Sequence, residues 1–236
     1  MDELINADFT KRIVLATNDL PWILSPQAGV ERRLLDRIGG EVARATSLVR
    51  YAANSVFPAH SHALGEEFLV LDGVFQDEHG DYPVGFYIRN PPTSHHTPGS
   101  EPGCTILVKL WQFDADDRTY VRIDTGKMPF LPALDRPGVE LMPLFDNERE
   151  NVRLERWKPD AEIPLGDPAG IELMVLDGGF VEGDETFEPQ SWLRIPPGEA
   201  ATVRAGPNGC KAWVKSGHLA LAQAAPSYSS EASPAS

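Results

Sequence analysis

Four residues whose side chains bind metals lie close together in the first half of the chain: His60, His62, Glu66 and His96. Alternate residues of an extended strand point to the same face, so His60 and His62 project together. Glu66 follows four residues later and reaches the same face if the strand resumes after a short turn at residues 63–65. Three imidazoles and one carboxylate form a suitable ligand set for a divalent transition metal. The spacing therefore predicts one metal site at these four residues.

Two neighbouring residues compete with members of this set. His95 is adjacent to His96, and residue type alone leaves it as an alternative ligand. Glu67 is adjacent to Glu66, but the strand period of two places it on the opposite face from His60 and His62. We therefore assign Glu66 to the metal.

The second half of the chain repeats the first at an offset of 105 or 106 residues: EFLVLDG at 67–73 matches ELMVLDG at 172–178, and LVRY at 48–51 matches LERW at 154–157. Glu67 recurs as Glu172, which favours a structural role. Lys109 recurs as Lys215, which favours either an ion pair or a stem lying on apolar surface with the ammonium group in water over a catalytic amine. The metal ligands do not recur: His60 and His62 align with Gly166 and Pro168, Glu66 with Ile171, and His96 with Ala201. A repeat of this length predicts a duplicated domain rather than a solenoid unit.

The pattern of elements is that of an all-β protein. Gly 20 and Pro 21 indicate many turns and short strands. We expect strands at residues 12–17 and 20–23 and a hairpin at residues 39–40, whereas residues 31–37 fit either a helical turn or a strand. The predicted domains are 1–30 (N-terminal strands packing on the second barrel), 31–115 (metal-binding), 116–135 (linker), 136–220 (without metal ligands) and 221–236 (a disordered tail).

Composition excludes several classes of function. Net charge is −14, with 35 acidic against 21 basic residues, which argues against nucleic acid binding. We find no apolar run of the roughly 20 residues that a membrane span needs, and no signal peptide at the N-terminus. Only Cys104 and Cys210 are present, so we expect a reducing, cytoplasmic location and interpret both as buried packing residues. We expect His218 to lie at the surface.

The register of these residues resembles the two cupin motifs. The first is matched by Asn54, His60, His62, Glu66 and Gly73, and the second by Gly85, Pro91, Thr93, His96 and Ser100. Three positions depart from the pattern, since Asn54 and Thr93 replace glycines and Ser100 replaces an asparagine. The register selects His96 over His95. The sequence around the motifs, such as GEEFLVLDGVFQDEHGDYP, is similar to that of the ChrR-like cupins, most closely over residues 10–125.

The resemblance implies a double cupin, that is, two antiparallel barrels or jelly rolls. It indicates zinc as the metal, although other cupins use iron or manganese and imidazole also suits nickel. A regulatory or sensing module is the function it favours, and the alternatives are a dioxygenase acting on a small diketone-like substrate and a structural zinc site. A small-molecule ligand would bind at the metal.

Partners follow from the same comparison. Cupins pair their sheet edges, so we expect a homodimer. We do not expect a sigma factor as partner. The ChrR anti-sigma factor holds one through a separate N-terminal zinc domain, whereas the first histidine here is His60 and the first cysteine is Cys104.

Overall fold

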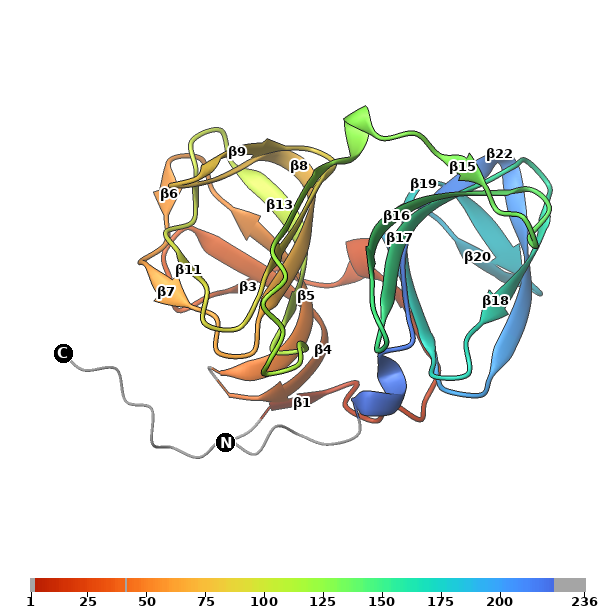
Figure 1. The fold of residues 1–236 in the computed structure, drawn as a ribbon, viewed down its shortest axis with the longest axis horizontal. Helices are drawn as coiled ribbons and strands as arrows, with labels where there is room; N and C mark the ends of the chain where they lie inside the picture. Colours follow the sequence, from red (N-terminus) through yellow and green to blue (C-terminus); the bar gives the residue numbers. More distant parts are fainter. Residues whose placement is uncertain (1–2, 41, 223–236) are drawn as a thin grey trace.

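The structure, a computed structural model, describes residues 3–40 and 42–222 as an all-β protein with two large antiparallel sheets (Figure 1). Residues 223–236, most of the predicted tail, lie outside the described residues. Among the described helices, none has the length and apolar character that a membrane crossing requires.

The first sheet has 11 strands: β1 (Glu3–Ile5), β3 (Ile23–Leu24), β4 (Val30–Gly39), β5 (Ala43–Tyr51), β6 (Ser55–Val56), β8 (Glu66–Asp77), β9 (Gly80–Pro83), β10 (Phe86–Asn90), β12 (Gly99–Ser100), β13 (Cys104–Leu110) and β14 (Val121–Asp124). A separate two-stranded ladder joins β7 (His60–Ser61) to β11 (His95–His96).

The second sheet has nine strands: β2 (Ile13–Ala16), β15 (Leu131–Pro132), β16 (Val139–Asp146), β17 (Asn151–Trp157), β18 (Glu162–Gly166), β19 (Ile171–Glu182), β20 (Glu185–Phe187), β21 (Ser191–Ile195) and β22 (Ala200–Ser216). Three short 3-10 helices complete the fold: η1 (Thr17–Asp19), η2 (Thr125–Lys127) and η3 (Leu219–Leu221).

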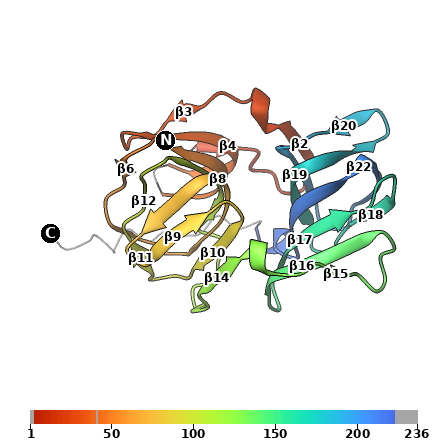
Figure 2. The same ribbon diagram turned by 90° about the horizontal axis from the view of Figure 1, so that it is seen from above.

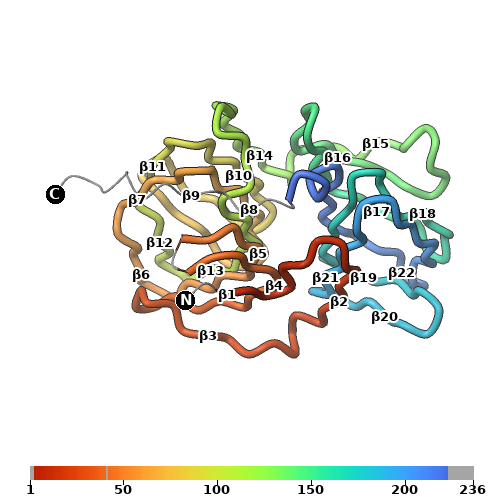
Figure 3. The backbone as a smooth tube through the Cα atoms, turned by 90° about the horizontal axis from the view of Figure 1, so that it is seen from below, coloured from red at the N-terminus to blue at the C-terminus, as the bar shows by residue number. Residues whose placement is uncertain are grey.

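The two sheets have the same order of strands. The first runs β4-β5-β13-β8-β10-β14, with β3 on β4, and the second runs β15-β16-β17-β22-β19-β21-β2. Each half receives its last strand from the segment that precedes the other half in sequence. β2 crosses to pair with β21 of the second sheet, and β14 pairs with β10 of the first (Figures 2 and 3). The two halves are therefore tied together by an exchange of strands.

Alternation along the central strands explains why they are buried on both faces. Phe68 and Val70 of β8 belong to the core of the first sheet, whereas Leu69 between them packs in a shared cluster with Leu154 and Trp213 of the second half. Successive side chains of a strand point to opposite faces. One face of each sheet thus covers its own core, and the other face packs against the other half.

Buried ion pairs also cross between the halves. Lys109 binds Glu172, and Lys215 binds Glu67, which is the reciprocal pair in the sequence repeat. All four side chains are at most 1% exposed. The predicted role of Lys109 and Lys215 in ion pairing is confirmed. Their burial rules out the alternative in which the lysine stem lies on apolar surface with its ammonium group in water.

The structure corrects several expectations. Neither sheet closes into a barrel through the strand pairings of the described residues, because β1 and β14 end one sheet order and β15 and β2 end the other. Of the strand predicted at residues 20–23, only Ile23 lies in a strand, since η1 ends at Asp19 and β3 covers Ile23–Leu24. His218 is buried rather than at the surface, with 7% exposure.

Other segments adopt structure where the sequence left the assignment open. Residues 31–37 lie within β4, which forms a hairpin with β5, and Cys104 and Cys210 are both buried. The stretch treated as a linker, residues 116–135, contains β14, η2 and β15.

Candidate metal centre

The fold brings His60, His62, Glu66 and His96 together in one cluster. One ligand atom from each of them lies within 4.8 Å of the others. The three imidazole rings face one another, with centroids 5.0 Å apart for His60–His62 and for His60–His96, and 4.7 Å apart for His62–His96. His62, Glu66 and His96 are buried, and His60 is half-buried. This cluster is able to hold a divalent metal ion.

Three chain segments position the cluster. His60 lies opposite His96 in the β7–β11 ladder, and His95 lies opposite Ser61. His96 is 3% exposed, whereas His95 is exposed, because neighbouring residues of a strand point to opposite sides. The ladder continues into His62, whose backbone N–H donates to the Ser94 carbonyl at 2.9 Å.

A tight turn delivers Glu66 to the same place. The chain turns at residues 63–65, and Gly65 has a φ of +76°. A side chain on Gly65 would lie 2.4 Å from the ring of Phe113, so the position requires glycine. The turn is fixed to the end of β13 by a hydrogen bond from the Trp111 N–H to the Gly65 carbonyl. Glu66 then begins β8.

The imidazole rings are oriented by their Nδ1 atoms. His60 Nδ1 lies 3.0 Å from the Pro58 carbonyl oxygen, and His62 Nδ1 lies 2.9 Å from Ser94 Oγ. These contacts leave Nε2 of each ring for a metal. The Nε2 atoms of His62 and His96 are buried and have no hydrogen-bond partner among the described residues. Buried polar atoms normally have partners, so these orphaned nitrogens fit a site built for a cation.

Glu66 is held by a chain of two hydrogen bonds. Asn90 Nδ2 donates to Glu66 Oε2 at 3.0 Å, and Arg122 Nη2 donates to Asn90 Oδ1 at 2.8 Å. Arg122 therefore fixes which end of the Asn90 amide faces Glu66. Arg122 lies on β14, so the strand that crosses from the segment before the second half also supports the cluster.

Electrostatics within the cluster sets its protonation. Burial lowers the pKa of His62 below its usual value. For His96 burial acts in the same direction, but Asp77 and Glu66 outweigh it and raise the pKa. For Glu66 burial opposes ionisation, but the charges of His62 and His96 outweigh it and lower the pKa. The carboxylate is thus ready to bind a cation at neutral pH.

Asp77 is a supporting residue that sequence reasoning missed. Its Oδ2 lies 3.5 Å from His96 Nδ1, and its side chain is 1% exposed. Strand parity counted from Glu66 would point Asp77 the other way. A register shift in the pairing of β8 with β13, where Val70 and Asp72 face successive residues, reverses the parity and returns Asp77 to the inner face. An acidic residue at the end of a strand is a weak sequence signal for a site residue. The bulge that turns Asp77 towards His96 is seen only in the structure.

The two motif positions that replace glycine both have positive φ. Asn54 has a φ of +60°, and Thr93 has a φ of +72°. Asparagine tolerates this region, whereas a β-branched threonine is strained there. The equivalent of Thr93 in the second half is Gly198, with a φ of +79°. The backbone is thus preserved in both halves, although the residue types differ.

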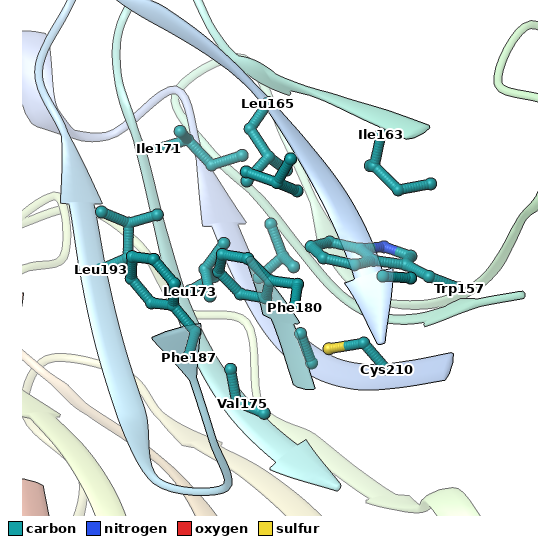
Figure 4. Packing of buried hydrophobic residues seen from close by; sticks show 14 of the residues in the cluster. Trp157, Ile163, Leu165, Ile171, Leu173, Val175, Phe180, Phe187, Leu193 and Cys210 are labelled. Carbon is teal, nitrogen blue, oxygen red and sulfur yellow. The ribbon is translucent and has the colours of Figure 1, made fainter. Parts of the chain in front are cut away.

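The second half carries an apolar cluster at the corresponding place. Leu165 lies opposite Ala201 in the β18–β22 ladder, as His60 lies opposite His96. This pairing corrects the sequence alignment, which matched His60 with Gly166. Leu165 and Ile171, the equivalent of Glu66, are 2% and 3% exposed and pack in the core of the second sheet (Figure 4).

Comparison of three-dimensional structures finds the same fold in several proteins. A candidate dioxygenase from Nostoc punctiforme superposes with a TM-score of 0.74 and 15% identity, covering 93% of this chain and 87% of the other. A glyoxylate-induced protein from Pseudomonas aeruginosa gives 0.67 and 12%, covering 92% and 90%. The bacterial pirin of Escherichia coli in complex with nickel(II) gives 0.61 and 12%, covering 87% and 98%. At these identities the likeness shows the fold alone.

Comparison of sequences gives a narrower result. No curated protein matches the chain. Residues 10–114 match the ChrR cupin-like domain family, and this range contains all four residues of the cluster. The part of the chain that contains the candidate metal centre is therefore similar to the ChrR cupin-like domain family.

Proposed function

We propose that the chain binds one zinc ion through His60, His62, Glu66 and His96, and that it acts as a metal-dependent regulatory or sensing module. The observation that carries the proposal is the set of four convergent ligands in which the buried Nε2 atoms of His62 and His96 have no partner among the described residues.

The number and spacing of the ligands favour zinc. Structural zinc sites are closed by four protein ligands, whereas catalytic zinc sites keep three and leave a position open. Two ligands bound to one tetrahedral zinc at about 2.0–2.1 Å are about 3.4 Å apart. Glu66 Oε2 lies 3.4 Å from His62 Nε2 and 3.6 Å from His96 Nε2. These two pairs of ligand atoms fit a closed tetrahedral site, which suits sensing or structure better than turnover.

A dioxygenase acting on a small diketone-like substrate is the second candidate. It is supported by the likeness to the Nostoc punctiforme structure, described as a candidate dioxygenase, over 93% of this chain. In that case an octahedral iron or manganese ion would supply a Lewis-acidic, redox-active centre with positions left for substrate. Glu66, held by Asn90, and His96, beside Asp77, would orient the metal.

Metal analysis separates the two candidates. Protein purified without chelators or added metals should contain one zinc per chain by mass spectrometry, and should not consume oxygen with a panel of small diketones. Stoichiometric iron together with oxygen uptake would overturn the zinc-sensor proposal in favour of the dioxygenase. Two metals per chain would contradict the assignment of a single site.

We further propose that the chain is a double cupin that arose by duplication and that it forms a homodimer. The matching strand orders and the reciprocal ion pairs support the duplication. Exposed apolar side chains on edge strands support the dimer, with Leu24 of β3 76% exposed and Leu131 of β15 58% exposed. Light scattering at micromolar concentration should give twice the chain mass, and a monomer would refute the dimer.

A further inference from the structure

A cavity of about 140 Å³ lies between the two halves. Leu64, from the turn between His62 and Glu66, forms part of its wall, as does the segment 111–113 that follows β13. The second half contributes residues 149–150 before β17 and the segment around η3. Leu221 at the rim is 52% exposed, so the cavity is open to small solutes on this side.

Three polar side chains on the wall are buried: Arg44 is 5% exposed, and Glu150 and His218 are 7% exposed. Arg44 Nη2 donates to Gln112 Oε1 at 3.2 Å. Arg44 Nη1 has no hydrogen-bond partner among the described residues. A buried donor without an acceptor destabilises the folded state, so a ligand that brings oxygen acceptors would be favoured here.

The balance of charge around Arg44 favours an anion. Asp36 is shared by two guanidinium groups, Arg44 and Arg194, each 3.7 Å away, so two cations face one carboxylate. Burial raises the pKa of Asp36, against the charges of Lys109 and Arg44, which weakens this carboxylate as a counter-ion. Glu150, the acidic residue on the wall, is already paired with Arg89 at 2.6 Å and Lys215 at 2.8 Å.

The remaining charged groups near the cavity are paired as well. Arg149 on the rim binds Asp114. His218 Nε2 lies 3.3 Å from Glu172 Oε2, and Glu172 also binds Lys109. Glu172 and Asp8 act on Arg194 in addition to Asp36, so the guanidinium with the weakest counter-ion is that of Arg44, which reaches the cavity wall.

The volume sets the size of the ligand. An apolar cavity of about 150 Å³ holds a molecule of benzene, and a water occupies about 30 Å³ of liquid. A cavity of about 140 Å³ therefore accepts about four to six non-hydrogen atoms. We propose that this cavity between the halves binds a small carboxylate, whose oxygens accept hydrogen bonds from Arg44. This site is separate from the metal centre and goes beyond the function proposed above.

Isothermal titration calorimetry with sodium acetate and with acetamide tests the proposal. The two probes have the same shape and number of heavy atoms, but only acetate is charged. Acetate should bind saturably at one site per chain, and acetamide at least tenfold more weakly. Equal binding of both, or no acetate binding, would overturn the proposal.

Three variants locate the binding. Ala222→Leu fills the cavity from the η3 side, and Gln112→Glu places a competing carboxylate beside Arg44. Each should weaken acetate binding at least tenfold, and circular dichroism melts identify whichever variant is folded. His60→Ala reports on acetate bound at the metal and should leave the affinity within twofold. Loss of binding in His60→Ala, with no change in the folded cavity variants, would place acetate at the metal and refute the site.

Discussion

The two halves of the molecule share one order of strands but differ in what fills the same position. In the first half His60 faces His96 across a short ladder, and Glu66 begins the next strand. In the second half Leu165 faces Ala201 at the equivalent place. Buried imidazole nitrogens without hydrogen-bond partners, such as Nε2 of His62 and of His96, are costly in a core, whereas leucine and isoleucine are stabilised by burial. The strand scaffold therefore forms in the second half without the four residues of the candidate metal centre.

The residues that both halves retain have a different role. Lys109 with Glu172 and Lys215 with Glu67 are related by the sequence repeat, and each pair crosses between the halves. The charged residues that recur in the sequence repeat thus lie at the contact between the halves. The four residues of the candidate metal centre do not recur. Adjacent residues can belong to different classes, as Glu66 and Glu67 do.

Replacing His96 should have the largest effect, which is on metal affinity. His96→Ala removes a ligand that arrives on a separate strand, and we expect metal affinity to fall by more than about 100-fold, beyond the loss typical of supporting residues. His95→Ala is the matched control, since His95 is exposed on the other side of β11. Metal content by mass spectrometry checks both variants. Loss in His95→Ala with retention in His96→Ala would mean that the assigned register is wrong.

Replacing Glu67 should affect stability and leave the metal in place. Burial opposes ionisation, but the charges of Lys215 and Arg89 outweigh it and lower the pKa of Glu67 to about 2. Glu67→Gln breaks a buried pair and should reduce the free energy of unfolding by about 3 kcal/mol at pH 7. Denaturant melts measure this change.

The pH dependence of stability and the variant Glu66→Gln test the role of Glu67 further. Because the folded pKa of Glu67 is below its usual 4.5, its stabilisation is present above pH 4.5 and is lost as pH falls towards 2. The difference between wild type and Glu67→Gln should shrink over that range. Glu66→Gln should do the converse at neutral pH, weakening metal binding with little loss of apoprotein stability. Metal loss in Glu67→Gln would contradict the division of roles.

The smallest expected effect concerns backbone strain. Thr93 and Gly198 occupy equivalent positions with φ of +72° and +79°. Thr93→Gly should raise the free energy of unfolding by about 0.5–1 kcal/mol, because relief of strain exceeds the entropic cost of glycine. Gly198→Thr should lower it by a similar amount, since a Cβ there meets no atom within 4 Å and only strain opposes it. Thermal melts check both, and a drop in metal content of Thr93→Gly would instead tie the strain to the site.

Much of this molecule could be predicted from local pattern. The all-β class follows from turn residues and alternation, and the spacing of His60, His62, Glu66 and His96 predicted the cluster that the structure brings together. The repeat anticipated the matching strand orders because it aligned residues over long ranges. Errors arose where tertiary contacts decide the outcome. Residues 20–22 of the predicted strand at 20–23 lie between η1 and β3. His218, near the C-terminal end of the described chain, is buried beside the cavity between the halves.

The sequence by itself determined the ligand types and their spacing, because residues two apart on a strand share a face whatever surrounds them. Only the tertiary structure decided which residues support them. Asp77 reaches His96 through a register shift, Arg122 reaches Asn90 on an exchanged strand, and Lys215 meets Glu67 across the molecule. These contacts join residues far apart in the chain, so they depend on how the sheets pair and pack, which no local pattern encodes.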